Sequence, residues 1–173
     1  DFERLSLESL QIGNPQGWQV KKEWDLADNK SGFRMRIALK PDPLGNANNF
    51  LRADGKFRGV TPQQFVDYLL NPANLPGLQV WNDVATLPDG SLIKYCKVKA
   101  PLMAARDHCW RYIIDKRDDG SIFVCIRTTT HPQCCETPGV IRAYYYNSTV
   151  FRMSTDAEEE GVLLMTEFIF QDL

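Results

Sequence analysis

Histidine and cysteine side chains come together at one place in the sequence, the segment HPQCC. His131 precedes Cys134 and Cys135 by three and four positions, so a Cys–His pair with an activated thiol is one candidate chemistry. No strand–turn–helix pattern surrounds the segment, and no third residue is placed to orient the histidine. The chain has two histidines, and its cysteines lack the spacing of zinc ligands. We therefore expect no catalytic residue, no metal and no cofactor, and we do not expect an enzyme.

Composition argues against two other classes of protein. The chain of 173 residues has 22 acidic and 20 basic residues, whereas a nucleic-acid partner usually requires a basic surface. No apolar run approaches the roughly 18 residues of a membrane span, and no signal peptide opens the chain. The five cysteines, an odd number, indicate a reducing compartment. We expect a cytoplasmic domain without a nucleic-acid partner, and Asp1 indicates a fragment trimmed from a longer protein.

Two helices are predicted in the first half of the chain. Apolar residues recur every three positions within residues 2–12 and indicate a short helix. Thr61 and Pro62 are typical of a helix start, and Asn71, which precedes another proline, should end that helix. The following residues should share one side of this second helix: Phe65, Tyr68 and Leu69.

Alternating apolar and polar residues predict many strands, so the fold class should be α+β. The predicted strands span residues 17–24, 32–40, 49–60, 78–87, 91–99, 107–117, 121–130, 140–153 and 161–173. In the third of them, the pair Asp54-Gly55 leaves open a turn instead of a continuous strand. Most later connectors have hairpin length, which favours an antiparallel meander, with the acidic run 158–160 at an exposed tip.

One loop joins two strands without the residues that tight turns prefer. Pro101, Leu102 and Met103 form it, and no glycine or asparagine stands beside them. The loop either packs on a neighbouring helix or presents apolar area to a partner such as a membrane. Three lysines before the loop could favour an anionic membrane surface: Lys94, Lys97 and Lys99.

Four motifs follow one another along the second half of the chain: the loop with Pro101, the pair Arg106-Asp107 opening a strand, the pair His131-Pro132, and Gly-Val-Ile-Arg ending at Arg142. In this order they resemble the motifs of the START family, the StAR-related lipid-transfer domains. Trp81-Asn82-Asp83 is similar to the family's Trp-Asp element after its second helix. The resemblance covers essentially the whole chain. It implies a helix-grip fold, in which N-terminal and inter-strand helices and a curved antiparallel sheet enclose a lipid cavity.

The family's long C-terminal helix would begin where this sequence ends. The resemblance therefore implies one START-like domain over residues 1–173, truncated before that helix. Without a covering element, the inner face of the sheet would expose more apolar area than a soluble monomer tolerates. A partner chain or domain that covers the open face would remove this exposure of apolar area.

The resemblance also implies which side chains line the cavity, because alternate residues of a strand face the same side. The implied lining residues are His108, Trp110, Tyr112, Ile114, Phe123, Cys125, Arg127, Ile141, Ala143, Tyr145, Leu163, Met165, Glu167, Ile169 and Gln171. Leu102 and Met103 are implied to gate the cavity at a membrane surface. Filling a core is the competing interpretation for the aromatic and aliphatic members of the set.

The charged residues depart from two patterns of the family. The acid–Arg pair of sterol-type members would fall on Lys94 (or Ile93) and Tyr112, and is missing. The Arg–Asp pair of phosphatidylcholine-type members would fall on Leu78 and Asn82, and is also missing. Arg127 and Glu167 are instead expected either to pair with each other inside the cavity, to meet a charged headgroup, or to lie exposed at strand ends.

The function implied by the resemblance is carriage of one hydrophobic lipid, a sterol, phospholipid or sphingolipid, with transient membrane contact. The alternative is a START-like domain that serves as a structural or regulatory interaction module within a larger assembly. A bound lipid distinguishes the two functions, because the interaction module would carry none.

Overall fold

The computed structural model describes residues 18–25, 34–41, 49–99, 101 and 104–172. Within them one α-helix, two 3-10 turns and ten strands are present. The strands are β1 Gln19–Asp25, β2 Arg34–Pro41, β3 Asn49–Arg58, β4 Leu78–Thr86, β5 Leu92–Val98, β6 Arg106–Lys116, β7 Ile122–Thr128, β8 Ile141–Arg142, β9 Tyr144–Met153 and β10 Val162–Asp172. The helical elements are α2 Pro62–Leu70, η1 Pro72–Asn74 and η2 Ala157–Glu159. The helix predicted within residues 2–12 lies outside the described residues.

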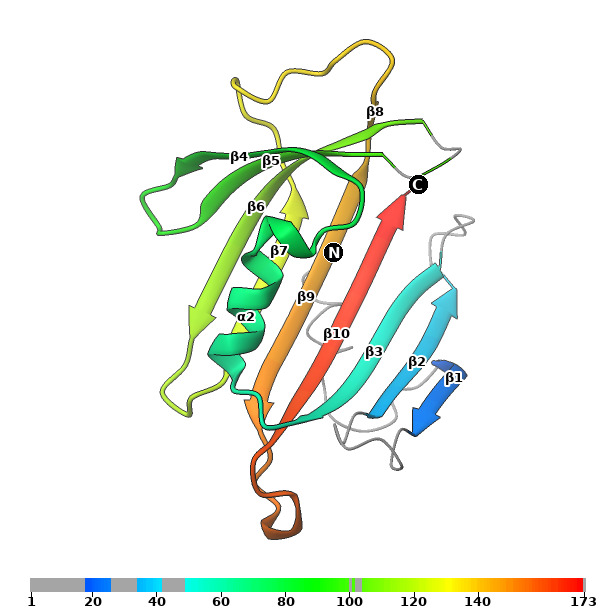
Figure 1. Cartoon of the computed structure of the whole chain (residues 1–173), viewed down its shortest axis with the longest axis vertical. Coiled ribbons are helices and arrows are strands. Elements are labelled where there is room, and N and C mark those ends of the chain that lie inside the picture. Colours follow the sequence, from blue (N-terminus) through cyan, green and yellow to red (C-terminus); the bar gives the residue numbers. More distant parts are fainter. Residues whose placement is uncertain (1–17, 26–33, 42–48, 100, 102–103, 173) are drawn as a thin grey trace.

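All ten strands belong to one sheet, with the order β1-β2-β3-β10-β9-β7-β6-β5-β4 and with β8 beside β6 (Figure 1). Every pairing is antiparallel except that of β8 with β6. The last strand, β10, lies between β3 and β9 and so joins the first three strands to the later meander. The predicted α+β helix-grip architecture, a large antiparallel sheet with a helix on one face, is confirmed.

Two hairpin turns of the meander are closed by the same hydrogen bonds within an Asp-Gly-Ser segment. Asp89 accepts hydrogen bonds from the amide and hydroxyl of Ser91 at 3.0 and 2.6 Å, and Asp119 accepts the equivalent pair from Ser121 at 2.9 and 2.6 Å. The glycine between each pair has φ near +80°, a conformation that side chains with a Cβ rarely adopt. These local contacts close the β4–β5 and β6–β7 turns between the predicted strands.

The helix α2 begins and ends where its sequence predicts. The Thr61 hydroxyl accepts from the Gln64 amide at 3.2 Å, and the Gln64 side chain accepts from the Thr61 amide at 2.9 Å, which forms a capping box. Asn71 caps the other end. In Figure 1, α2 lies across one face of the sheet, which we call the inner face.

Separate apolar clusters cover the two faces of the sheet. On the inner face, Val66 of α2 packs with Phe151, Leu163 and other buried residues of β3, β7 and β10. On the opposite, outer face, Phe50 and Phe168 lead a second cluster. Strands buried on both faces have apolar residues at consecutive positions, so their sequence lacks a clear alternation.

The third predicted strand is continuous, and the alternative of a turn at Asp54 and Gly55 is wrong. Gly55 pairs with Met165 in the middle of β3. A Cβ atom built on Gly55 would lie 2.8 Å from the ring of Phe57, closer than real contacts allow. Gly55 therefore gives the Phe57 ring its space on the inner face.

Candidate functional site

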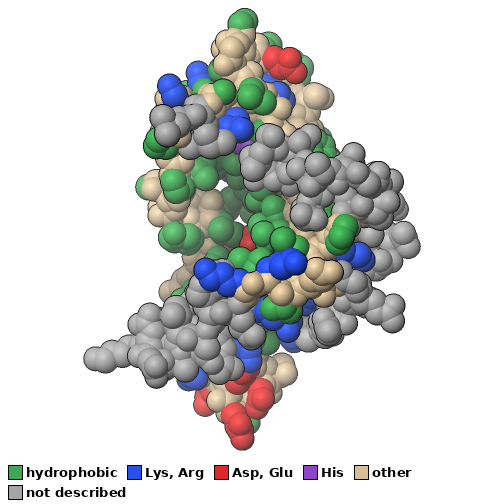
Figure 2. Space-filling model, turned by 90° about the vertical axis from the view of Figure 1, so that its right-hand side faces the viewer, with side chains coloured by type: hydrophobic (Ala, Val, Ile, Leu, Met, Phe, Trp, Pro, Cys, Tyr) green, Lys and Arg blue, Asp and Glu red, His purple; other side chains and the backbone are tan. Residues whose placement is uncertain are grey.

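A cavity of about 580 Å3 lies between α2 and the inner face of the sheet. Its walls come from β3, α2, β9 and β10 and are mostly apolar. The lining residues are Phe57, Val60, Gln64, Phe65, Tyr68, Leu69, Phe151, Met165 and Glu167. Figure 2 shows hydrophobic side chains gathered in a hollow of the described surface. A space of this size with few polar groups suits an apolar or amphipathic molecule.

Aromatic rings build the wall of this cavity on the side of α2. The Phe65 ring lies 4.8 Å from that of Phe57 and 5.0 Å from that of Phe151. One turn further along α2, Tyr68 and Leu69 border the cavity but remain 57% and 37% exposed. The side of α2 that the sequence marked as apolar is therefore only partly used for packing against the sheet.

Glu167 is the acidic residue of the cavity wall, and its partner is Asn147 on the neighbouring strand. The Asn147 amide donates to the Glu167 carboxyl at 2.5 Å and accepts from the Thr149 hydroxyl at 2.9 Å. Burial raises the pKa of Glu167, although the bond from Asn147 acts in the opposite direction. The carboxyl group therefore holds its proton to a higher pH than a glutamate in water.

Replacing Glu167 with glutamine should stabilise the protein at neutral pH and change little in acid. The folded state holds the proton more tightly than the unfolded chain does, so stability falls as the pH rises above the ordinary glutamate value of 4.5. We expect a gain of about 1 kcal/mol near pH 7.5 and almost none near pH 4. Urea unfolding at both pH values measures it, with exposed Glu160→Gln as the control. An equal gain at both pH values would contradict the expectation.

Aromatic side chains occupy the inner face at the other end of the sheet. The His108 ring lies 4.5 Å from that of Trp110 and 6.5 Å from that of Tyr145, while Trp110 and Tyr145 are 5.6 Å apart. Trp110 also meets Tyr112 at 6.0 Å. Burial lowers the pKa of His108 from 6.5 to about 4, so its imidazole is neutral at physiological pH. All four residues lie on the face that the resemblance implied.

The register of strand β7 contradicts the cavity-lining residues that the resemblance implied for this strand. Its pairing with β9 places Ile122 and Val124 opposite Phe151 and Thr149, so the even-numbered residues of β7 face inward. Three predicted residues lie on the outer face: Phe123, Cys125 and Arg127. Their predicted placement in the cavity is wrong by one position along the strand. A shift of one residue moves every side chain of a strand to the opposite face.

The predicted inward pair of Arg127 and Glu167 is excluded by the same register. Arg127 pairs with Tyr146 and shares its outer face, whereas Glu167 shares the inner face with Asn147. The two side chains therefore lie on opposite sides of the sheet.

The other predicted lining residues divide into three groups. Leu163, Met165 and Ile169 share the inward register of Glu167, and Ile114 shares that of Trp110. Ile141 of β8 pairs with Arg106, so it shares the inner face as implied, where it is 48% exposed. Ala143 is buried between β8 and β9, and the backbone of Gln171 pairs with Tyr145. Leu102 and Met103 lie outside the described residues, and their role as a gate stays a prediction.

Lys94 belongs to the interior and not to the surface. It is 8% exposed, forms an ion pair with Asp83, and its ammonium lies 5.3 Å from the centre of the Trp81 ring. Its predicted part in attracting an anionic membrane is therefore wrong. This cation is neutralised on the inner face, where Lys94 pairs with Trp110 across the strands.

Two of the family-like motifs meet in a buried ion pair. The Arg142 guanidinium donates to both oxygens of Asp107, at 2.7 and 3.0 Å, and to the carbonyl of Cys134 at 2.9 Å. The Tyr95 hydroxyl donates to the same carboxylate at 3.1 Å. The sequence showed both motifs but not their contact across 35 residues.

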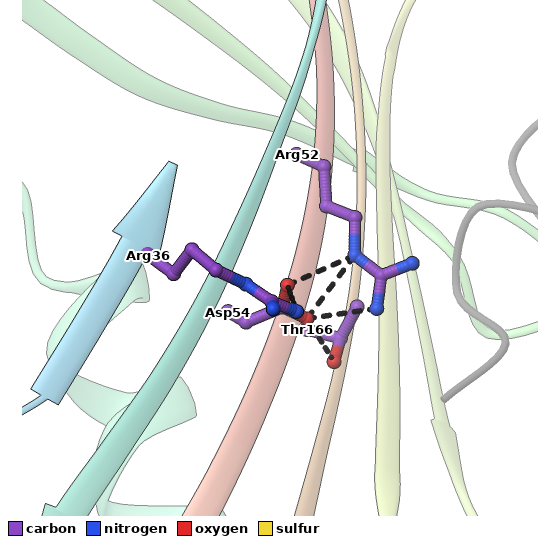
Figure 3. A network of polar contacts seen from close by, with 4 residues as sticks. All are labelled: Arg36, Arg52, Asp54 and Thr166. Atoms are coloured by element: carbon purple, nitrogen blue, oxygen red, sulfur yellow. Dashed lines mark hydrogen bonds and ion pairs between the residues drawn. The ribbon is translucent and has the colours of Figure 1, made fainter. Parts of the chain in front are cut away.

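A second charged network, which sequence reasoning missed, lies on the outer face (Figure 3). Asp54 accepts from Arg52 at 2.9–3.1 Å, from Arg36 at 3.1 Å and from the Thr166 hydroxyl at 3.1 Å. These contacts lower the pKa of Asp54 even though burial acts in the opposite direction. Arg52 is 2% exposed, so the network holds a cation within the protein.

The segment from His131 to Cys135 forms a turn. The His131 ring accepts from the Gln133 amide at 3.3 Å, and the Cys135 thiol donates to the Pro132 carbonyl at 3.2 Å. Cys134 is buried beside Cys109. Among the described residues, no group of three or more His, Cys, Asp or Glu is placed to hold a metal ion.

Comparisons with known proteins identify the class of fold. No protein-family model and no curated protein sequence matches the chain. Solved structures do match: the human StarD13 (DLC2) lipid transfer and protein localization domain superposes with a TM-score of 0.72, at 16% identity, over 91% of this chain and 75% of that one. The fold of this chain is therefore the START helix-grip fold.

Two further structures agree. Human STARD10 matches with a TM-score of 0.72 and 14% identity, over 97% of this chain and 71% of that one. A fragment of a STAR-related lipid transfer protein from Xanthomonas axonopodis matches with a TM-score of 0.65 and 16% identity, over 91% and 83% of the two chains. No helix among the described residues is long and apolar enough to cross a membrane.

Proposed function

We propose that this chain is a lipid-binding module that holds one lipid against the inner face of its sheet. The observation that carries the proposal is the mostly apolar cavity of about 580 Å3 between α2 and strands β3, β9 and β10. The names of the structures with the same fold, which describe lipid transfer, support it. The apolar part of the lipid would lie against Phe57, Phe65 and Met165, and its carriage requires no chemical step.

Polar replacement of the exposed cavity border should weaken lipid binding without loss of stability. We expect the double substitution Tyr68→Gln and Leu69→Gln to lower uptake of a fluorescent lipid from vesicles about tenfold, because it removes apolar contact area. Thermal unfolding should change little, since both side chains are partly exposed.

The control for this prediction is a similarly exposed apolar pair outside the cavity, Val20→Gln with Val80→Gln, at 50% and 36% exposure. Equal uptake by both double variants would contradict the proposed site. Mass spectrometry of lipid extracts from the purified protein tests the function itself. Absence of any lipid, together with no uptake from vesicles, would favour a structural or regulatory interaction module.

A further inference from the structure

Three buried nitrogen atoms without a hydrogen-bond partner lie on one face of β6. They are Arg106 Nε, His108 Nδ1 and Trp110 Nε1, the only such side-chain atoms found among the described residues. The residues alternate along the strand, so all three side chains share the inner face. His108 is 4% and Trp110 is 7% exposed, so water does not freely replace the missing partners.

An unpaired buried polar group is unfavourable, so three of them on the sheet face that also carries the cavity indicate a ligand. The indole nitrogen of Trp110 can only donate, which requires an acceptor on the ligand. The neutral imidazole of His108 donates or accepts at Nδ1, according to its tautomer. A hydroxyl or carbonyl oxygen satisfies Trp110, and the centre of the His108 ring lies 4.5 Å from that of the Trp110 ring.

A series of contacts links these residues to the cavity. The Trp110 ring packs on that of Tyr145, which lies two residues before Asn147 on the same face of β9. Asn147 in turn donates to Glu167 in the cavity wall. The inner face therefore has an apolar end beneath α2 and a polar end at β6, which is the layout that an amphipathic molecule requires.

The charges of the inner face favour an uncharged headgroup. Lys94 is already neutralised by Asp83, and burial favours the uncharged forms of His108 and Glu167. An anionic headgroup beside Trp110 would lose its hydration, and the unpaired cation beside this site, Arg106, is not deeply buried. Arg106 stands at the start of β6, is only half-buried, and donates to the Ala104 carbonyl at 3.3 Å.

We propose that His108 and Trp110 bind the hydroxyl or carbonyl headgroup of an uncharged lipid whose apolar part fills the cavity beneath α2. This inference rests on the proposed lipid-binding function. It assigns the ligand a class and an orientation, with the headgroup at β6 and the apolar part at β3 and β10.

Trp110→Phe tests the inference, because it removes the donor and keeps an aromatic ring. The matched control is Trp18→Phe, since Trp18 contacts Phe168 on the outer face. Fluorescence titration of the full chain would use three labelled probes: cholesterol, ceramide and phosphatidylserine. We expect both uncharged probes to bind more tightly than phosphatidylserine, and Trp110→Phe to weaken them about tenfold. Trp18→Phe should stay within about twofold of the unmodified chain.

Stability separates a binding role from a packing role. Without probe, Trp110→Phe should unfold at a temperature equal to or above that of the unmodified chain, because it removes an unpaired buried donor. Should that variant fail to fold, the indole N–H resonances of the unmodified chain provide the test. One of them should shift downfield when the best-bound uncharged probe is added, and no shift would overturn the inference.

The outcomes for the inference and for the proposed function differ. Preference for phosphatidylserine, or equal affinities for Trp110→Phe and Trp18→Phe, would overturn the inference while lipid binding stands. If none of the three probes binds the unmodified chain and its extracts hold no lipid, the proposed function fails, and the inference fails with it.

Discussion

Replacing Arg142 with alanine is expected to lower the free energy of unfolding by about 3–5 kcal/mol. Asp107 is 1% exposed, and the substitution would remove the guanidinium that contacts both of its oxygens. A buried carboxylate without its cation is far less favourable than the intact pair. The Cys134 carbonyl would also lose its donor, so the connection between β7 and β9 should loosen.

Urea unfolding at neutral pH measures this effect. Arg142→Lys should recover only part of the loss, because an ammonium cannot donate to both carboxylate oxygens in the same planar arrangement. The control is Arg117→Ala, which breaks a surface pair with Asp115 at 3.5 Å and should cost less than about 0.5 kcal/mol. Similar losses for the two alanine variants would show that the buried pair is not a main contributor to stability.

Replacing Asp54 with alanine should cost about 3 kcal/mol at neutral pH. Arg52 donates three hydrogen bonds to this carboxylate, and its side chain is 3% exposed. The substitution leaves a guanidinium in the protein without this carboxylate. Arg36→Ala is the matched control, because Arg36 joins the same carboxylate from a side chain that is 38% exposed and should cost less than about 1 kcal/mol.

The pH dependence of the Asp54 effect has a definite sign. The contacts lower the pKa of Asp54 in the folded state, so its stabilising contribution is complete above the ordinary value of 3.8. The contribution should disappear as the pH falls through the lowered folded value. Asp54→Ala and the unmodified chain should therefore converge in stability in strong acid. A difference that stays constant from neutral pH into strong acid would show that the carboxylate charge is not its source.

Short-range signals predicted most of the fold because their causes act over a few residues. The Thr61 cap, the helix end at Asn71 and the positions of most strands were visible in the sequence. The face of a buried strand has no such local cause. Cys109 of β6 is 0% exposed beside Trp110 at 7%, and Cys125 of β7 is 6% exposed beside Val124 at 2%, so both strands are buried on both sides and their sequences show no preferred face. The inward residues were implied by the family resemblance, which placed His108 and Trp110 on the observed face and the residues of β7 on the opposite one.

The sequence by itself determined most strands and the helix α2, because each depends on the intrinsic preferences of neighbouring residues. The strand predicted over residues 140–153 is an exception, since it divides into β8 and β9, and β8 pairs with β6. Tertiary structure alone decided the register of β7, the place of β10 between β3 and β9, and the partners of Glu167 and Asp107. These features depend on pairings between residues far apart in the chain, and a shift of one residue exchanges the two faces of a strand. The cavity beneath α2 follows from those pairings, since its walls come from four elements separated along the sequence.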